Sequence, residues 1–439
     1  MCNEGAAAHR WNWKHTEELV EAFSACTCNY EFAANDSIGK LLAACAKLSF
    51  YCQELCNEGI RRLDDMSIRR TDAIRILLAA ATLGHEMTTT KSEKSVLQWL
   101  LSEESERFWL PGAEGDGSPR RLLQLSYALT LLQVSCSTTK YSKGSTSRRS
   151  RLPAWLWTRL EEIKKLQPTG RIPEWRMLAP VLVLNDTDIS TMTGREEDRF
   201  EFLGNQHQRP ELQLLKPSDN SETGGSQMER NIRAFLTAPE VSFGGGGGLR
   251  FRSSSSSLIT SSLALEWKKR YGLSVDFVLE LLHEEKSSSR SWTILFEVDG
   301  PAHFCLYPGL SRPLGRTLAK RAMLERLCAV HRRMGGQWIK EQSSSGGLEN
   351  GQKTGDESLP GVQSLSTISI PYFEVVKKVG SSLFPSTGGD NRDTTAACAA
   401  YKGDGAVDYE RVWNYVRTRL WGEEGVGEEG VVNQVSTAL

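Results

Sequence analysis

The sequence predicts a multidomain protein that joins an N-terminal all-α region of helical-hairpin repeats to a C-terminal α/β domain. Three observations lead to this fold class. An Ala- and Leu-rich helical pattern recurs in the first third of the chain, buried strands alternate with helices after residue 263, and glycine and serine runs interrupt the chain as disordered insertions. Hydrophobic residues make up 39% of the 439 residues, which is enough to build more than one core.

The N-terminal region, residues 11–135, contains the clearest internal repeat. Its apolar pattern occurs in residues 38–48, in residues 74–84 and, more loosely, in residues 122–129. An offset of about 35 residues aligns Ala46 with Ala81, and a period in the thirties is typical of helical hairpins that stack into a solenoid. Small alanine side chains let such helices approach closely. A helical bundle with Ala-rich interfaces and no ligand stays open as the alternative.

The middle region, residues 136–262, is expected to contain helical segments joined by flexible linkers. Helical patterns cover residues 152–166 and 228–236, and a glycine run at 244–248 precedes a serine run at 253–257. A phosphate-binding loop would need a terminal Lys-Ser or Lys-Thr, which the glycine run lacks, so we interpret it as a flexible insertion. Later stretches of similar composition have the same interpretation: residues 341–359, residues 381–405 and the tail 421–439.

Charge and cysteine content limit the partners and the compartment. Lys and Arg number 53 and Asp and Glu 54, so any nucleic-acid surface must be a local basic patch. The 10 cysteines include no CxxC pair, and we interpret them as buried free thiols of a reducing compartment rather than as zinc ligands. No apolar run approaches the ~20 residues that cross a membrane. Several glutamates among the first residues argue against a clean targeting peptide.

The C-terminal domain is organised around residues 292–304, WTILFEVDGPAHF. The first half is β-branched and apolar, and a Gly-Pro pair ends it, which predicts a buried strand. Because side chains alternate along a strand, Glu297 and Asp299 are expected on the same face. Two buried acids on one face are costly unless they are paired, hydrogen-bonded, protonated or bound to a cation. His303 follows within a few residues.

The neighbouring segments complete an α/β pattern. Residues 273–279 form a weakly alternating strand that carries Asp276, and a polar tip at residues 284–291 predicts a hairpin with the next strand. Three further segments follow: a helix at residues 316–327, a strand at residues 367–373 that is ended by its proline, and a closing helix at residues 408–420. We therefore expect one α/β domain within residues 263–420.

These segments resemble the RAP domain, an RNA-binding domain of apicomplexan, plant and algal organelle proteins that also occurs in animal FAST-kinase-like proteins of mitochondria. The resemblance rests on VDF, FEVDGPAHF, a G-x-T-x-x-K segment with Gly315, Thr317 and Lys320, and ISIPYFEV, in that order. It implies a small restriction-endonuclease-like α/β fold and a role in organellar RNA metabolism. The repeats expected in residues 11–135 resemble the α-hairpin repeats that precede RAP domains.

Two interpretations of the carboxylates are open. Restriction-endonuclease-like nucleases need an Asp followed by an acid-x-Lys on the next strand, and their acids hold a divalent cation. Asp276 and Glu297 fit the two acids, but Asp299 stands at the position of the Lys. A metal-dependent endoribonuclease would bind Mg²⁺ or Mn²⁺ through these three acids and would use Lys320 and His303 to complete the site. In the interpretation that we favour, the domain keeps the fold and binds RNA without cutting it or needing a cofactor.

A basic stretch supports RNA binding under either interpretation. Between residues 312 and 333 the only acid among many basic residues is Glu325. Phosphate contacts from such residues give affinity without reading the sequence. The expected RNA-binding residues are Arg312, Arg316, Lys320, Arg321, Arg326, Arg332, Arg333 and, as a stacking side chain, Tyr307. A solvated helix face is the alternative interpretation of this stretch.

Together these features predict an RNA-binding protein that acts in organellar RNA processing, RNA stability or ribosome assembly. The mitochondrion is the expected compartment, with the plastid or apicoplast as the alternative. The expected partners are organellar rRNA or mRNA, with no membrane partner. Two alternatives stay open: the metal-dependent endoribonuclease, and a structural subunit of an organellar ribosome whose repeats bind ribosomal proteins.

Overall fold

Two units make up the part of the chain that the structure, a computed structural model, describes. The described residues are 34–64, 68–87, 91–110, 119–138, 152–166, 177–185, 227–238, 249–253, 273–284, 289–305, 312–333, 365–376 and 407–421. The helical unit contains those up to 166 together with 304–305 and 312–318, and the α/β unit contains the rest. None of the described helices is both long and apolar enough to cross a lipid bilayer.

Some of the sequence predictions fall on residues outside these ranges. They are Tyr307, the glycine run at 244–248, most of the serine run at 253–257, the insertions at 341–359 and 381–405, and the tail beyond Trp421. These predictions stay as they were made.

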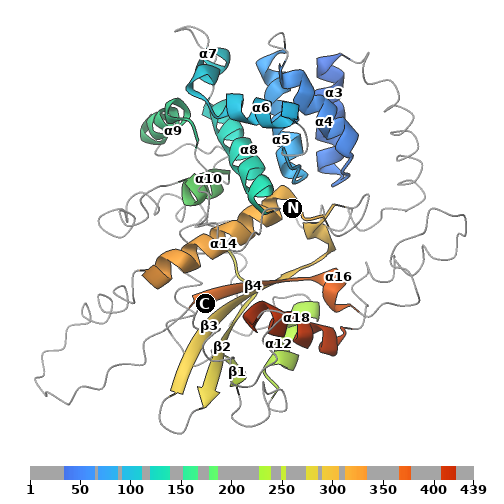
Figure 1. Cartoon of the computed structure of the whole chain (residues 1–439), viewed down its shortest axis with the longest axis vertical. Helices are drawn as coiled ribbons and strands as arrows, with labels where there is room; N and C mark the ends of the chain where they lie inside the picture. The colour runs from blue at the N-terminus through green and yellow to red at the C-terminus, as the bar shows by residue number, and fades with distance from the viewer. Residues whose placement is uncertain are drawn as a thin grey trace, which may run out of the picture. The chain divides into compact units, whose positions relative to one another are not determined.

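Helices form the helical unit. They are α3 (Asn35–Lys47), α4 (Gln53–Arg61), α5 (Arg70–Thr82), α6 (Lys91–Leu100), α7 (Glu106–Trp109), α8 (Pro119–Thr138) and α9 (Ala154–Leu166), with the 3-10 turns η3 (Arg62–Asp64) and η4 (Glu103–Ser105). The repeated apolar pattern corresponds to α3, α5 and α8, which pack against one another in that order (Figure 1). Helix α4 packs on both α3 and α5, and α9 packs on α8. In the described part of this unit the regular elements are helical, as predicted. Stacked hairpins would give this packing order.

The first two copies of the repeat also end in the same way. Ser49, just after α3, and Gly84, just after α5, have positive φ angles of 55° and 66°. In both copies the next residue donates its backbone N–H at 2.9 Å to a carbonyl in the last turn, which closes the helix end. The aligned alanines differ, because Ala81 is fully buried whereas Ala46 is half-buried. The two copies therefore agree in the backbone geometry of their helix ends but differ in the burial of the aligned alanine side chains.

A four-stranded sheet in the order β1-β2-β3-β4 is the centre of the α/β unit. The elements are α10 (Leu178–Asn185), α12 (Gln227–Leu236), β1 (Leu249–Ser253), β2 (Phe277–Glu284), β3 (Ser289–Asp299), η9 (Pro301–His303), α14 (Gly315–Arg333), β4 (Leu365–Pro371), α16 (Tyr372–Val375) and α18 (Tyr409–Trp421). Strands β1, β2 and β3 are antiparallel neighbours, whereas β4 pairs in parallel with β3. The coarse prediction of a helical region and an α/β region is confirmed.

The strands differ in detail from those predicted. The expected polar tip at 284–291 is shorter, because β2 continues to Glu284, which pairs with Ser289 at the start of β3. Strand β2 also begins later than predicted, at Phe277, so Asp276 lies immediately before it instead of within it. Strand β1 lies in the stretch that we interpreted as a flexible insertion, where LRFRS alternates apolar and basic residues between the glycine and serine runs. Strand β4 ends at its proline, Pro371, as predicted, but it begins at Leu365, and Tyr372 and Phe373, which were expected in the strand, belong to α16.

The first turn of α14 belongs to the helical unit. A Cβ on Gly315 would lie 1.8 Å from the carbonyl oxygen of Ala81, so this approach of two backbones requires glycine. Just before it, the guanidinium of Arg312 lies 3.8 Å from the centroid of the Tyr51 ring and donates a hydrogen bond of 2.9 Å to the Gly84 carbonyl. Packing within the helical unit therefore explains the glycine of the G-x-T-x-x-K segment.

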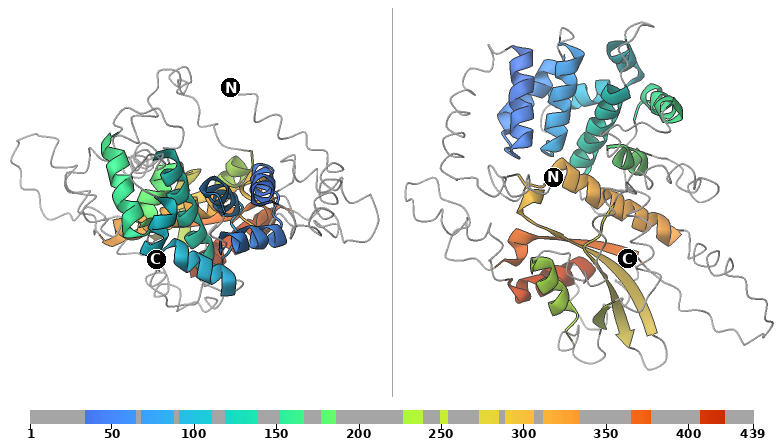
Figure 2. Two further views of the ribbon diagram at one scale, coloured as in Figure 1. Left: turned by 90° about the horizontal axis from the view of Figure 1, so that it is seen from above. Right: turned by 180° about the vertical axis from the view of Figure 1, so that it is seen from behind.

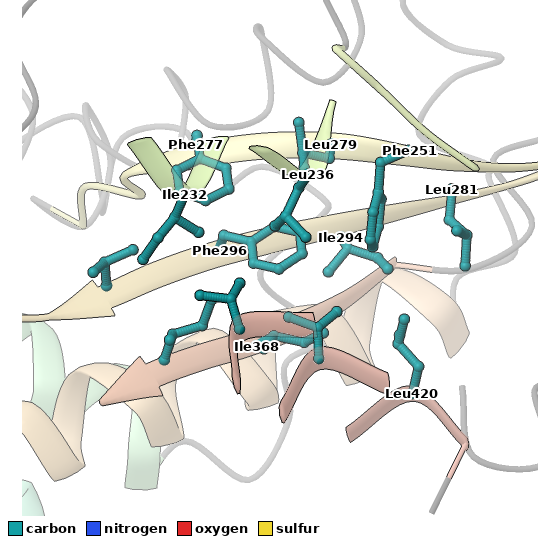
Figure 3. Packing of buried hydrophobic residues seen from close by; sticks show 14 of the residues in the cluster. Ile232, Leu236, Phe251, Phe277, Leu279, Leu281, Ile294, Phe296, Ile368 and Leu420 are labelled. Carbon is teal, nitrogen blue, oxygen red and sulfur yellow. The ribbon is translucent and has the colours of Figure 1, made fainter. Parts of the chain in front are cut away.

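One face of the sheet forms the apolar core of the α/β unit. Helices α12 and α18 lie side by side over this face (Figures 1 and 2). Alternate residues of β3, including Ile294 and Phe296, pack there against Ile232 of α12 and Leu420 of α18 (Figure 3). Phe296 is fully buried, and its ring stacks on that of Phe277 with the centroids 5.0 Å apart. The residues between them on β3 point to the opposite face, which carries the candidate site.

Candidate functional site

Strand β3 brings two acids into the interior of the α/β unit. Glu297 and Asp299 are each 2% exposed, and they follow Thr293 and Leu295 on the face opposite the apolar core. This placement is the one expected from the alternation of side chains along a strand. Both carboxyl groups are removed from water, so the structure must compensate their desolvation through other groups.

Asp276 joins these two acids from the start of the neighbouring strand. Its backbone N–H donates to the Phe296 carbonyl at 3.2 Å, and its Oδ2 accepts a hydrogen bond of 2.7 Å from the Val298 N–H. The Asp276 carboxyl therefore lies beside β3 at the residue between Glu297 and Asp299. The structure thus brings together the three acids that the sequence analysis grouped.

Two consecutive residues of α14 reach the two buried acids. The Lys320 ammonium contacts Oε2 of Glu297. Arg321 donates to Oδ2 of Asp299 from both Nε, at 3.0 Å, and Nη2, at 2.6 Å. Both basic side chains are about three-quarters buried, with exposures of 23% and 25%. The face of β3 that carries the acids is therefore covered by a helix that supplies a cation for each of them.

His303 completes the cluster at the end of the strand. The chain leaves β3 at Gly300, turns through η9, and closes this turn with a hydrogen bond of 2.9 Å from the His303 N–H to the Gly300 carbonyl. The imidazole Nδ1 then lies 3.0 Å from Oδ1 of Asp299, and 37% of the side chain stays exposed. The predicted neighbourhood of His303 and Asp299 is present, with the histidine as a partner of the acid.

The pKa values of the two buried acids are shifted in opposite directions. Burial raises the pKa of Glu297 to about 8, because desolvation outweighs the attraction of Lys320. Desolvation also acts on Asp299, but the His303 hydrogen bond and the Arg321 guanidinium outweigh it and lower the pKa of Asp299 below its usual value. At neutral pH Glu297 is therefore mostly protonated, whereas Asp299 is ionised and paired. The pKa of Asp276 is raised, mainly by desolvation and against the Val298 hydrogen bond.

A divalent cation does not fit this arrangement well. Magnesium is held by one or two carboxylates, while waters and substrate phosphates complete its octahedron of oxygens, so those carboxylates must be open to the ion. The oxygens of Asp299 already accept from Arg321 and His303, and Oε2 of Glu297 contacts Lys320. Oε1 of Glu297 is buried and has no hydrogen-bond partner among the described residues. Within the described ranges no three His, Cys, Asp or Glu residues are arranged to hold a metal ion.

The residues of the predicted basic patch have different environments. Lys320 and Arg321 point into the carboxylate cluster, and Arg326 donates to the Leu184 carbonyl at 2.5 Å. Arg312 binds within the helical unit, and Arg316 is an exposed residue of α14. Arg332 and Arg333 lie in the last turn of α14, and their side chains are outside the described part. Much of the positive charge of this stretch therefore acts inside the protein.

A buried polar chain in the helical unit was not predicted from the sequence. The Tyr51 hydroxyl lies 3.0 Å from Nδ1 of His85, and Nε2 of His85 lies 3.1 Å from Oε1 of Glu93. All three residues are buried, and the Tyr51 ring is the one that carries the Arg312 guanidinium. The one sequence signal of this polar chain is the position of His85, which directly follows Gly84 at the end of the second copy of the apolar pattern.

Comparisons with family models, with curated proteins and with solved structures find no match to this chain. The candidate site therefore stands on its own geometry. That geometry is two buried carboxyl groups on β3, each in contact with a basic side chain of α14.

Proposed function

We propose that this chain is an RNA-binding protein whose α/β unit holds RNA without cutting it. The observation that carries this proposal is the compensation of the two β3 acids by the chain itself. Glu297 contacts Lys320 and burial raises its pKa, and Asp299 is paired with Arg321 and His303. A metal-dependent nuclease needs those carboxylates ionised and open to a cation.

The RNA part of the proposal is supported by the resemblance to the RAP domain. In the restriction-endonuclease-like fold that this resemblance implies, an Asp lies beside an acid-x-Lys on the adjacent strand. Here Asp276 lies beside β3, Asp299 stands in the position of the Lys, and Lys320 comes from α14 instead. We infer a domain of this type in which Glu297 and Asp299, at the positions of metal-binding acids, pair instead with Lys320 and Arg321.

The biological setting is proposed on the same basis. Organellar rRNA or mRNA is the proposed partner, and the mitochondrion is the proposed compartment. The stacked order of α3, α5 and α8 suits an extended binding surface, which is the usual use of helical repeats.

A binding and cleavage assay on the purified full-length chain tests the proposal. We expect a fluorescein-labelled single-stranded RNA of mixed sequence to bind with an affinity that falls as salt rises, because phosphate contacts release counterions. We expect the same RNA to stay intact with Mg²⁺ or Mn²⁺. Absence of any RNA binding at low salt would refute the proposed function. Metal-dependent cleavage that disappears in Glu297→Gln, with fold and RNA affinity intact, would establish the endoribonuclease instead.

A charge-reversal variant in α14 tests whether this helix contributes to RNA binding. Arg316 and Lys320 are four residues apart and therefore lie on one face of α14, but Lys320 contacts Glu297. Arg316→Glu is therefore the informative change, because it alters charge without opening the carboxylate cluster. A weaker affinity and a shallower salt dependence would show that this end of α14 contacts phosphate. Unchanged binding would leave α14 as a structural helix.

A further inference from the structure

A short segment from beyond β3 belongs to the helical unit. It comprises residues 304–305 and 312–318, which we name the strap. Its two parts are joined to each other, because the Cys305 N–H donates to the Arg312 carbonyl at 2.8 Å and Phe304 forms an antiparallel bridge with Pro313. Phe304, Cys305 and Leu314 are at most 2% exposed. The strap is therefore a folded part of the helical unit, held by its apolar side chains and its own backbone pairing.

The strap lies against the end of α5 through close backbone contacts. A Cβ on Gly84 would lie 2.6 Å from the Pro313 carbonyl oxygen, and a Cβ on Gly315 would meet the carbonyl oxygen of Ala81. The Cys305 thiol lies 3.6 Å from the Leu83 carbonyl oxygen, which it can use as an acceptor. Because glycines on both sides permit this approach, the end of the second repeat copy and the strap are complementary in shape.

Arg312 makes the polar contacts of the strap with the repeats. Its guanidinium lies 3.8 Å from the centroid of the Tyr51 ring, its Nη2 donates to the Gly84 carbonyl at 2.9 Å, and Glu86 is 3.8 Å away. The side chain is only 26% exposed, and its Nε is buried without a hydrogen-bond partner among the described residues. Burial of an unpartnered nitrogen costs free energy, so the closed position of Arg312 depends on the Tyr51 ring and the Gly84 carbonyl.

The orientation of the Tyr51 ring is set by residues of the repeats. The Tyr51 hydroxyl lies 3.0 Å from Nδ1 of His85, and Nε2 of His85 lies 3.1 Å from Oε1 of Glu93. The side-chain amide of Asn57, oriented with its nitrogen toward the acid, donates to the same Glu93 oxygen at 2.9 Å. None of these residues belongs to the strap. The ring that receives Arg312 is therefore held from the side opposite to the strap.

We propose that the strap is a latch on the helical unit, in which Arg312 closes against the Tyr51 ring and the Tyr51–His85–Glu93 chain holds that ring in position. The repeats supply the ring and the carbonyls, and the strap supplies the guanidinium. The strap opens as a local unit, which frees the first turn of α14 while the repeats stay folded. The inference gives the buried polar chain a positioning role and does not depend on RNA binding.

Hydrogen–deuterium exchange of the full-length chain, followed by mass spectrometry, tests this inference. The reporters are the strap amides of Cys305, Thr317 and Leu318, which are hydrogen-bonded within the strap. Arg312→Met should speed their exchange about tenfold, as expected for the loss of a cation–π contact and a hydrogen bond, and should change the exchange of α5 less than about twofold. Arg312→Lys keeps the charge without the flat guanidinium and should give a smaller increase.

Variants of the ring test the positioning role. Tyr51→Phe keeps the ring but removes its contact with His85, and should speed exchange of the strap about threefold. Tyr51→Leu removes the ring and should act like Arg312→Met. The double variant of Tyr51→Leu and Arg312→Met should be no faster than either single variant by more than about twofold, because both remove the same contact. If the two effects multiply, or if Tyr51→Phe exchanges like the parent chain, the proposed chain of contacts is wrong.

An arginine of the α/β unit provides the matched control. Arg326 also donates to a carbonyl at a helix end, that of Leu184 in α10, at 2.5 Å. Arg326→Met should leave exchange of the strap unchanged, and an increase as large as that of Arg312→Met would show general loosening instead of a latch. Equal acceleration of the strap and α5 in Arg312→Met would show that the strap is an inseparable part of the repeats. No acceleration in either Arg312 variant would show that Arg312 does not close the strap.

Discussion

The two faces of β3 use the same backbone in opposite ways. On one face Trp292, Ile294, Phe296 and Val298 belong to the apolar core with residues of α12 and α18, and Figure 3 shows Ile294 and Phe296 in this packing. On the other face Glu297 and Asp299 are just as well buried, but their partners are charged side chains of α14. The apolar face is stabilised by removal from water, which is insensitive to pH. The acidic face is stabilised only while each carboxyl has a proton or a cation.

This difference shows how a chain can bury acids at low cost. Glu297 keeps a proton at neutral pH, since burial raises its pKa to about 8. Asp299 stays ionised because Arg321 and His303 lower its pKa against the effect of burial. Two neighbouring acids therefore avoid mutual repulsion without a metal ion, because only one of them is charged. The following experiments test each face separately.

Truncation of the apolar face should have the largest effect. Phe296 is fully buried and contacts the rings of Phe277 and Phe251. Phe296→Ala should lower the free energy of unfolding of the α/β unit by roughly 3–5 kcal/mol, because it leaves a cavity in the centre of the core. Urea denaturation followed by tryptophan fluorescence measures this loss, and the loss should be the same at pH 5 and pH 8. A loss below 1 kcal/mol would show that Phe296 is not at the centre of the core.

The acidic face should respond to pH through Glu297. Its pKa is near 8 in the folded chain and near the ordinary value of 4.5 in the unfolded chain. A raised carboxyl pKa means that the folded state holds the proton more tightly, so stability falls as pH rises from about 4.5 to 8 and levels off above that. The expected loss over this range is of the order of a few kcal/mol.

Replacing Glu297 tests whether this residue causes the pH dependence of stability. Glu297→Gln should flatten the dependence of the unfolding midpoint on pH between 5 and 8, since glutamine carries no proton to lose. Asp299 contributes in the opposite direction: its pKa is lowered, so its stabilisation is present above the ordinary Asp pKa and is lost as pH falls through the lowered value. An identical pH profile for the parent chain and Glu297→Gln would contradict the protonated state of Glu297.

The two cations of α14 should matter unequally. Arg321→Met leaves Asp299 buried and ionised, which should cost about 2–3 kcal/mol, less than for a fully buried pair because Arg321 is 25% exposed. Lys320→Met should cost about 1 kcal/mol or less at pH 7, because Glu297 already carries a proton. Thermal unfolding of the two variants measures the difference. Adding Asp299→Asn to Arg321→Met should recover part of the loss, and equal losses for the two single variants would refute the assigned charge states.

Sequence patterns predicted the two faces but not what covers them. Alternation along β3 was sufficient to place Glu297 and Asp299 together, and the 35-residue offset was sufficient to find α3 and α5. Arg321 was assigned to RNA alone, and Lys320 was assigned both to RNA and, in the endoribonuclease alternative, to the carboxylate site, since the sequence does not give the position of α14 over the sheet. Strand β1 was missed for a related reason: glycine and serine runs on both sides dominate the local composition, and pairing with β2 determines its structure.

The smallest effect is expected at Asp276, where hydrogen bonding and charge can be separated. Asp276 is exposed as a residue, yet its Oδ2 accepts the Val298 N–H at 2.7 Å. Asp276→Asn keeps an oxygen acceptor and removes a charge beside Glu297 and Asp299, so the free energy of unfolding should change by no more than about 0.5 kcal/mol. Asp276→Ala removes the acceptor as well and should cost about 1 kcal/mol. If Asn is as harmful as Ala, the charge of Asp276 supports the acidic face, and a bound cation would then become the better explanation of the cluster.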